Sequence, residues 1–170
     1  MTSITCPACG TLKTRVVARQ TLGDRLFGWA TVYPFRCQLC AHRFRAFVGR
    51  SAHCPRRDFD RIAVEFPVWF RPLHDSPLNM GCEGVIQDLS IRGCRIRSER
   101  PVPPSTKLEL EFQHSNVSFP ITVDEAVVRS MAAGTFGLRF TQLHREDQRR
   151  IRTILDVWLP EPSSPSRSSG

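Results

Sequence analysis

Four cysteines stand in two close pairs in the first part of the chain. Cys6 and Cys9 are separated by two residues, as are Cys37 and Cys40, and each pair can place two thiolates on one side of a tight turn. Together they supply four sulfur ligands in the tetrahedral set that zinc prefers, with no open position for a catalytic water. The spacing predicts a structural Zn²⁺ site, with a redox dithiol or unrelated thiols as the alternatives.

A second group of residues has the chemistry to bind a guanine nucleotide. Arg57 and Arg61 are spaced as Arg-x3-Arg, and a guanidinium can bond phosphate oxygens, bond guanine O6 and N7, or stack on a purine. Asp88 and Ser90 share one face of an extended stretch, where a carboxylate can accept from guanine N1 and N2. We expect Gly93 to adopt a positive φ and to let a base approach the backbone. Taken singly, each segment is also typical of an arginine-rich chain or of an ordinary capped turn.

The positive charge of the chain is concentrated in its first third. The 170 residues carry a net charge of +8, and residues 1–55 contain eight Lys and Arg against one acidic residue. A zinc tetrathiolate would add about two negative charges there, which weakens an argument for nucleic-acid binding from charge alone. Seven cysteines, an odd number, favour metal ligation in a reducing compartment over complete disulfide pairing. No apolar run approaches the roughly 18 residues of a spanning helix, so we expect a cytoplasmic protein with no membrane span.

The nucleotide-binding candidates lie at the ends of predicted β-strands. From Ile62 to Phe70 apolar residues alternate with other residues, as a half-buried strand requires, and Pro67 implies an edge position or a bulge. Six short strands with Gly, Pro and Ser-rich turns, and no long helix between them, predict a mainly β fold, a six-stranded antiparallel barrel. The expected strands cover residues 62–70, 85–89, 94–96, 108–112, 117–123 and 136–140. In the fifth of these, Val117 and Phe119 take part in the alternation, and the strand is expected to continue to 129.

The remaining segments complete an organisation in two modules. Residues 1–50 resemble a zinc ribbon, with β-prone stretches at 14–19, 29–35 and 44–48, and are too small to fold without the metal. Residues 51–60 are expected to form a linker that carries Arg57. Residues 61–159 are expected to form the barrel and a C-terminal amphipathic helix, and the Ser/Pro-rich residues 160–170 a disordered tail.

The order of these features resembles the PilZ domain family over roughly residues 55–159. An Arg-x3-Arg pair precedes the first barrel strand, Asp-x-Ser-x-x-Gly follows about 30 residues later, and the run 136–140 (Phe-Gly-Leu-Arg-Phe) and a terminal helix come last. Members of this family are cyclic di-GMP receptors built on a six-stranded barrel.

The resemblance also implies roles for the individual residues of the two motifs. It implies that Arg57 and Arg61 hold the phosphates and guanine edges of the ligand, and that Asp88, Ser90 and Gly93 hold a guanine against the barrel. Arg56 stands where an additional family arginine can favour an intercalated ligand dimer, so both one and two ligands per chain are expected stoichiometries.

The resemblance implies a cyclic di-GMP receptor, and we expect no enzyme, because the sequence reveals no pairing of an acidic residue with a nucleophile. We expect a mobile linker to fold over the ligand, to change the arrangement of the ribbon and the barrel, and so to signal to a protein partner. Two alternatives stay open: a ribbon that binds nucleic acid through its basic residues, and a protein-interaction adaptor, in either case with the barrel as a scaffold.

Overall fold

The fold consists of a small sheet unit and a barrel unit. A computed structural model of the chain describes residues 4–20, 31–48, 57–73, 81–100, 102–115 and 119–160. The compact units are Met1–Asp60 with Asp156–Gly170, and Arg61–Leu155. The chain leaves the first unit between Asp60 and Arg61, which is inside the Arg-x3-Arg segment.

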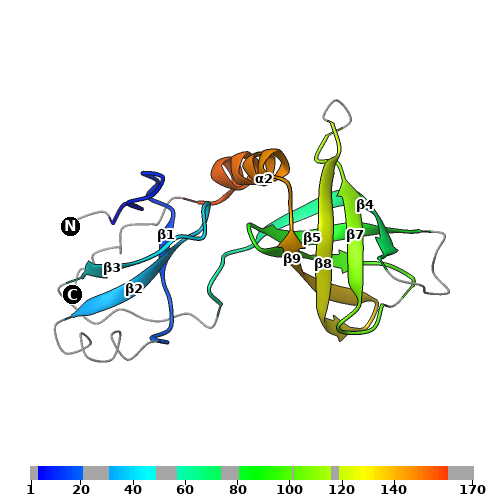
Figure 1. Ribbon diagram of the computed structural model, residues 1–170, viewed down its shortest axis with the longest axis horizontal. Coiled ribbons are helices and arrows are strands. Elements are labelled where there is room, and N and C mark those ends of the chain that lie inside the picture. Colours follow the sequence, from blue (N-terminus) through cyan, green and yellow to red (C-terminus); the bar gives the residue numbers. More distant parts are fainter. Residues whose placement is uncertain are drawn as a thin grey trace, which may run out of the picture. The chain divides into compact units, whose positions relative to one another are not determined.

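The first unit is built on a three-stranded antiparallel sheet in the order β1-β2-β3 (Figure 1). Its strands are β1 (Thr14–Val16), β2 (Val32–Cys37) and β3 (Arg43–Phe47). The rings of Phe35 and Phe44 stack across β2 and β3, with their centres 5.8 Å apart. Among the residues of this unit that the structure describes, the apolar side chains buried beside them are chiefly Val17 and Leu39.

The second unit is a closed six-stranded antiparallel barrel, which confirms the predicted fold class (Figure 1). Around the barrel the strands follow the order β4-β5-β6-β9-β8-β7. Closure leaves no long unpaired sheet edge among these strands. Their bounds are β4 (Ile62–Pro72), β5 (Cys82–Ser90), β6 (Gly93–Arg97), β7 (Lys107–Phe112), β8 (Ile121–Ala132) and β9 (Thr135–Gln142).

Strict alternation on β4 explains how the interior is filled. Buried and exposed residues alternate without a break from Ile62 to Pro72. Pro67, which has no N–H to donate, pairs with Val85 of β5 but lies just before the segment of β4 that pairs with β7. Pro67 therefore occupies a locally unpaired side of its strand, as the sequence predicted for an edge proline. The largest fully buried barrel side chains are Phe70, Phe112, Phe136, Ile86, Leu89, Ile96, Leu108, Leu110 and Ile121.

The fifth barrel strand begins later than the sequence predicted. Phe119, which we expected to alternate into the core, is 85% exposed, and β8 starts at Ile121. Pro120 separates the two residues, and its ring and missing N–H prevent the ladder from extending back to Phe119. Val117 lies outside the described residues.

One helix, α2 (Arg145–Trp158), follows the last strand. It buries Ile151, Ile154 and Leu155 on one side, and Glu146 and Asp147 in its first turn suit the positive end of the helix dipole. Among the residues that the structure describes, no helix is long and apolar enough to cross a membrane. The tail predicted at 160–170 lies outside the described residues after Pro160.

Candidate functional site

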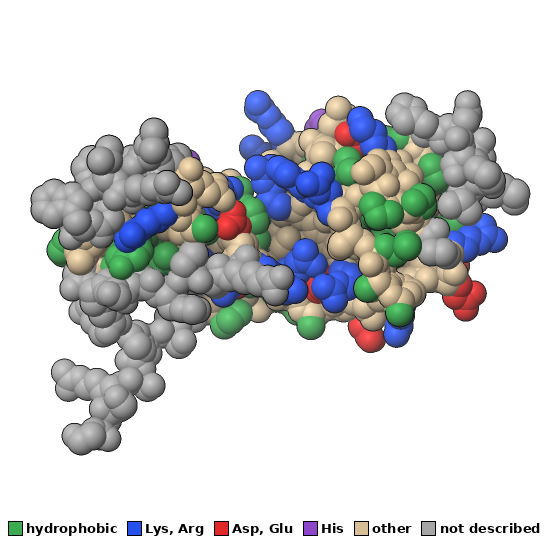
Figure 2. All heavy atoms as spheres, turned by 90° about the horizontal axis from the view of Figure 1, so that it is seen from below, with side chains coloured by type: hydrophobic (Ala, Val, Ile, Leu, Met, Phe, Trp, Pro, Cys, Tyr) green, Lys and Arg blue, Asp and Glu red, His purple; other side chains and the backbone are tan. Residues whose placement is uncertain are grey.

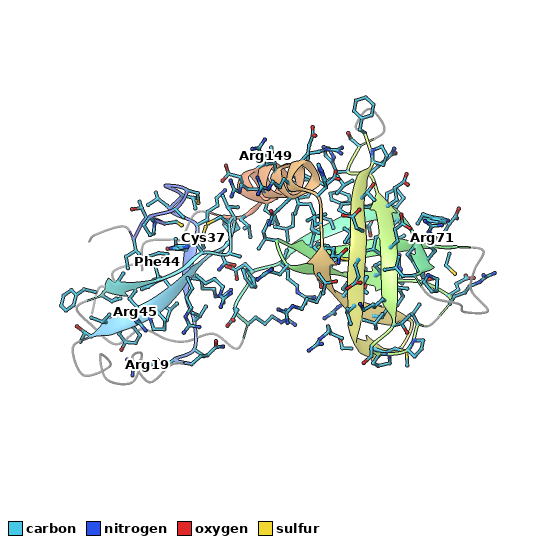
Figure 3. The ribbon with its side chains drawn as sticks, viewed as in Figure 1. Arg19, Cys37, Phe44, Arg45, Arg71 and Arg149 are labelled. Atoms are coloured by element: carbon cyan, nitrogen blue, oxygen red, sulfur yellow. The ribbon has the colours of Figure 1, made fainter. Side chains whose placement is uncertain are left out.

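The structure brings the four paired cysteines together in the first unit, which is called the ribbon unit from here on. Their sulfur atoms all lie within 4.8 Å of one another, with Cys6 Sγ 3.7 Å from Cys40 Sγ and Cys9 Sγ 3.5 Å from Cys37 Sγ. Zn–S bonds of about 2.3 Å in a tetrahedron require neighbouring sulfurs to be about 3.8 Å apart. The cluster therefore has the size of a zinc tetrathiolate site, and Figure 3 shows Cys37 at the end of β2.

The protein environment of these sulfurs also suits thiolate ligands. The backbone N–H groups of Leu39 and Cys40 both point at Cys37 Sγ, each at 3.4 Å, as donors to a negative sulfur would. Burial nevertheless raises the pKa of the Cys37 thiol well above its ordinary value. The buried sulfur therefore needs a cation to ionise near neutral pH, and a zinc ion would supply that charge.

Asp88 reaches the outer face of the barrel through a β-bulge. Ile86 pairs with Ile96 and Asp88 pairs with Arg95, so two residues of β5 advance against one residue of β6, and Gln87 is the extra residue. Ile86 is buried, and unbroken alternation would point Asp88 inward as well. The bulge shifts the phase, so Leu89 is buried and the carboxylate of Asp88 faces outward.

Cross-strand pairing gathers basic residues around this carboxylate. Asp88 is paired with Arg95, and in the next outward row Ser90 is paired with Gly93 and Gly93 with Arg139. Directly paired residues of antiparallel strands point to the same face, so Asp88, Arg95 and Arg139 share one outer surface, whereas Ser90 in the same row is buried. Figure 2 shows several Lys and Arg side chains on the face of the protein that is seen from below. The surface is suited to an anionic ligand.

Two arginines contact Asp88 directly. Arg61 Nη1 donates to Asp88 Oδ1 at 2.7 Å, and Arg95 Nε lies 3.5 Å from Asp88 Oδ2. The side chains of Arg61, Asp88 and Arg95 are 28%, 19% and 41% exposed, and pairs of this kind contribute at most about 1 kcal/mol. A carboxylate has about four lone-pair positions, so Asp88 keeps acceptor capacity for a guanine while it contacts both arginines.

Ser90 and Gly93 shape the turn that joins β5 to β6. Ser90 is buried, and its Oγ donates to the carbonyl oxygen of Gly93 at 3.0 Å. The expectation of a positive φ for Gly93 is wrong, because positive φ among the described glycines occurs only at Gly10, Gly81 and Gly134. Gly93 is required for another reason: a Cβ there would lie 2.0 Å from the carbonyl oxygen of Leu138 on β9.

The Arg-x3-Arg segment is divided between the two units. Arg61 belongs to the barrel unit, whereas Arg57 belongs to the ribbon unit and has an exposed side chain. Arg56 lies outside the described residues. Asp58 and Asp60, in the middle of the motif, form hydrogen bonds to Gln38 of the ribbon, a contact that spacing alone did not predict.

The site predicted from the sequence did not include two arginines of the outer surface. Arg95 stands two residues after Gly93, so strand alternation alone could have placed it on the same face. Arg139 joins this face through the pairing of β6 with β9, which becomes known only when the strand order is known.

Comparison with known proteins identifies a family for the whole barrel and most of the helix that follows it. The family model described as PilZ domain matches residues 55–156. The fold is similar to that of YcgR from Escherichia coli in complex with c-di-GMP, at 12% identity over 85% of this chain and 77% of that chain, with a TM-score of 0.50. It is also similar to MrkH from K. pneumonia in its apo state, at 16% identity over 86% of this chain and 76% of that chain, again with a TM-score of 0.50. No match is found among curated proteins.

Proposed function

We propose, because the chain belongs to the PilZ domain family, that the outer face of its barrel binds cyclic di-GMP and that the protein is a receptor for this second messenger. The observation that carries the proposal is the position of Asp88, which a β-bulge turns outward between Arg61 and Arg95. A carboxylate flanked by guanidinium groups offers an acceptor for guanine N1 and N2 beside donors for phosphate or for guanine O6 and N7.

Each motif residue has a task in this proposal. Asp88 accepts from the guanine, and Arg61 moves from its pair with Asp88 toward the ligand phosphate while Arg57 contacts the other side of the ligand. Ser90 fixes the turn, and Gly93 keeps β6 against β9 so that the outward rows stay together. Arg56 is proposed as an additional contact, which would allow a second stacked ligand. This set performs binding and requires no chemical step.

The same proposal includes a structural Zn²⁺ held by Cys6, Cys9, Cys37 and Cys40. A closed set of four thiolates positions its surroundings and offers no coordination site to a substrate. Ligand binding at the Arg-x3-Arg segment would change the arrangement of the ribbon and the barrel, and a protein partner would recognise the new arrangement. Small-angle scattering profiles that are the same with and without cyclic di-GMP would argue against this output.

Calorimetric titration of cyclic di-GMP tests the receptor function directly. We expect binding by the wild-type protein, with a stoichiometry of one or two that reports on the role of Arg56. Asp88→Asn and Arg61→Ala should each weaken binding by roughly 10–100-fold, because each removes a charged hydrogen-bonding partner of the ligand.

A matched control uses an arginine on β4, the strand that begins directly after Arg61. Arg71 lies on β4, contacts Glu109, and is labelled on the barrel in Figure 3. Arg71→Ala should bind cyclic di-GMP like the wild type. Absence of heat from the wild-type protein would refute the receptor function, and a salt-dependent shift of random-sequence DNA would then favour nucleic-acid binding.

A further inference from the structure

The side chain of Gln38 connects the segment between Arg57 and Arg61 to the turn between Cys37 and Cys40. Gln38 stands between Cys37 and Cys40, and its side-chain Nε2 donates to the carbonyl oxygen of Asp58 at 3.2 Å. Its Oε1 accepts from the backbone N–H of Asp60 at 2.6 Å. Nε2 also donates to the carbonyl oxygen of Arg36, at 3.2 Å. The residue is only 4% exposed, so water cannot readily replace these bonds.

Ribbon arginines hold the two acidic side chains of the same segment. Arg15 of β1 forms an ion pair with Asp60, and Arg36 Nη2 lies 3.8 Å from Asp58 Oδ2. The guanidinium of Arg36 also lies over the ring of Phe59, 5.3 Å from its centre. Asp58 and Asp60 stand between the two motif arginines and would repel the phosphates of cyclic di-GMP. Their pairing with ribbon arginines offsets this negative charge.

These contacts determine which part of the motif is fixed before a ligand arrives. Residues 58–60 are bonded to the ribbon, and the next residue, Arg61, is bonded to Asp88 of the barrel. A binding segment whose backbone is already held loses less conformational entropy when the ligand binds. The hydrogen bonds of Gln38 to this segment should therefore strengthen the binding of cyclic di-GMP and not oppose it.

We propose that Gln38 is a positioning residue that makes the affinity for cyclic di-GMP depend on Zn²⁺ at the four cysteines. The inference rests on the proposed receptor function and on the proposed zinc site. Zinc fixes the turn from Cys37 to Cys40, which carries Gln38. Gln38 in turn holds the backbone between Arg57 and Arg61. Coupling of two sites is reciprocal, so cyclic di-GMP should also slow the loss of zinc to a chelator.

A four-part cycle tests the coupling. Cyclic di-GMP is titrated calorimetrically into the wild type and into Gln38→Met, each loaded with Zn²⁺ and each stripped by a chelator. Methionine keeps the approximate volume of glutamine and removes its hydrogen bonds. We expect zinc to tighten ligand binding by about tenfold in the wild type, within the usual range of coupling between sites, and by no more than about twofold in Gln38→Met.

Two controls separate the coupling from a loss of folding. Gln113→Met replaces an exposed glutamine that follows β7 and should keep the full zinc dependence. If Gln38→Met does not retain one zinc per chain, Arg15→Met replaces it, because it frees Asp60 without touching the turn from Cys37 to Cys40. Arg15→Met should likewise reduce the zinc dependence.

Amide hydrogen exchange provides a reading that needs no ligand. The N–H of Asp60 should exchange slowly in the zinc-loaded wild type and quickly after zinc removal or in Gln38→Met. Zinc dependence of ligand affinity that is equal in the wild type and Gln38→Met would overturn the coupling and leave the receptor function intact. A zinc-loaded wild type that does not bind cyclic di-GMP would overturn both.

Discussion

Replacing Gly93 with alanine should force β6 away from β9. The new Cβ would lie 2.0 Å from the carbonyl oxygen of Leu138 and 3.2 Å from the Cα of Arg139, and both atoms belong to the backbone of the paired strand. A strand inside a closed barrel cannot rotate such atoms aside. Overpacking of this kind costs about 3 kcal/mol, and alanine regains about 0.5–1 kcal/mol because it restricts the unfolded chain more than glycine does. We therefore expect a net loss of about 2 kcal/mol.

Urea unfolding and thermal melting, followed by circular dichroism, measure this loss. A barrel of this size should melt about 8–16 °C lower, while a domain stability of roughly 5–15 kcal/mol leaves it folded at room temperature. Gly137→Ala is the matched control, because its Cβ would meet only the side-chain Oγ of Ser130, which can rotate, at 2.7 Å. It should cost less than about 1 kcal/mol. An unchanged melting temperature in Gly93→Ala would refute the reasoning, and a concurrent loss of ligand binding would then assign the glycine to ligand approach.

Two further outcomes follow from the cysteines. A strong chelator should unfold the ribbon unit without changing the urea midpoint of the barrel, and cooperative loss of both would contradict the two-module organisation. Burial raises the pKa of the Cys94 thiol above its ordinary value of 9.0, and Asp88 adds to the rise. The folded state therefore retains a proton that the unfolded state releases above pH 9. The free energy of unfolding of the barrel should be constant below pH 9 and should fall by up to about 1.4 kcal/mol per pH unit above it. Urea titrations at pH 8 and pH 10 should show a smaller loss of this free energy in Cys94→Ala than in the wild type.

Alternation and turn residues were sufficient to predict the barrel. The apolar residues of β4 recur at every second position, and this pattern alone indicates which of its side chains fill the interior. Pro67 could be placed because proline lacks the N–H that a doubly paired strand needs. Phe119 was misplaced by the same pattern, since an apolar residue at the right spacing does not show that Pro120 ends the ladder before it.

The candidate site was predictable as a set of residue types but not as a geometry. The spacing within each cysteine pair is local, whereas the pairing of β1 with β2 is needed to bring the two pairs together. The orientation of Asp88 depends on an extra residue, Gln87, that becomes visible only in the pairing of β5 with β6. Gln38 carries no signal in the sequence, because its partners in residues 58–60 are backbone groups about 20 residues away, which almost every residue type could supply.

The bulge at Gln87 changes which residues of β5 point into the barrel and which point outward. Before it, Cys82 and Ile86 of β5 are buried, and after it the phase is shifted, so that Leu89 is buried and the carboxylate of Asp88 faces outward. Outward residues such as Asp88 and buried residues such as Leu89 thus alternate along one strand, with the phase of the alternation set by the bulge. The outer surface of such a barrel could be redesigned by changing outward side chains alone, provided that the phase set by this one extra residue is kept.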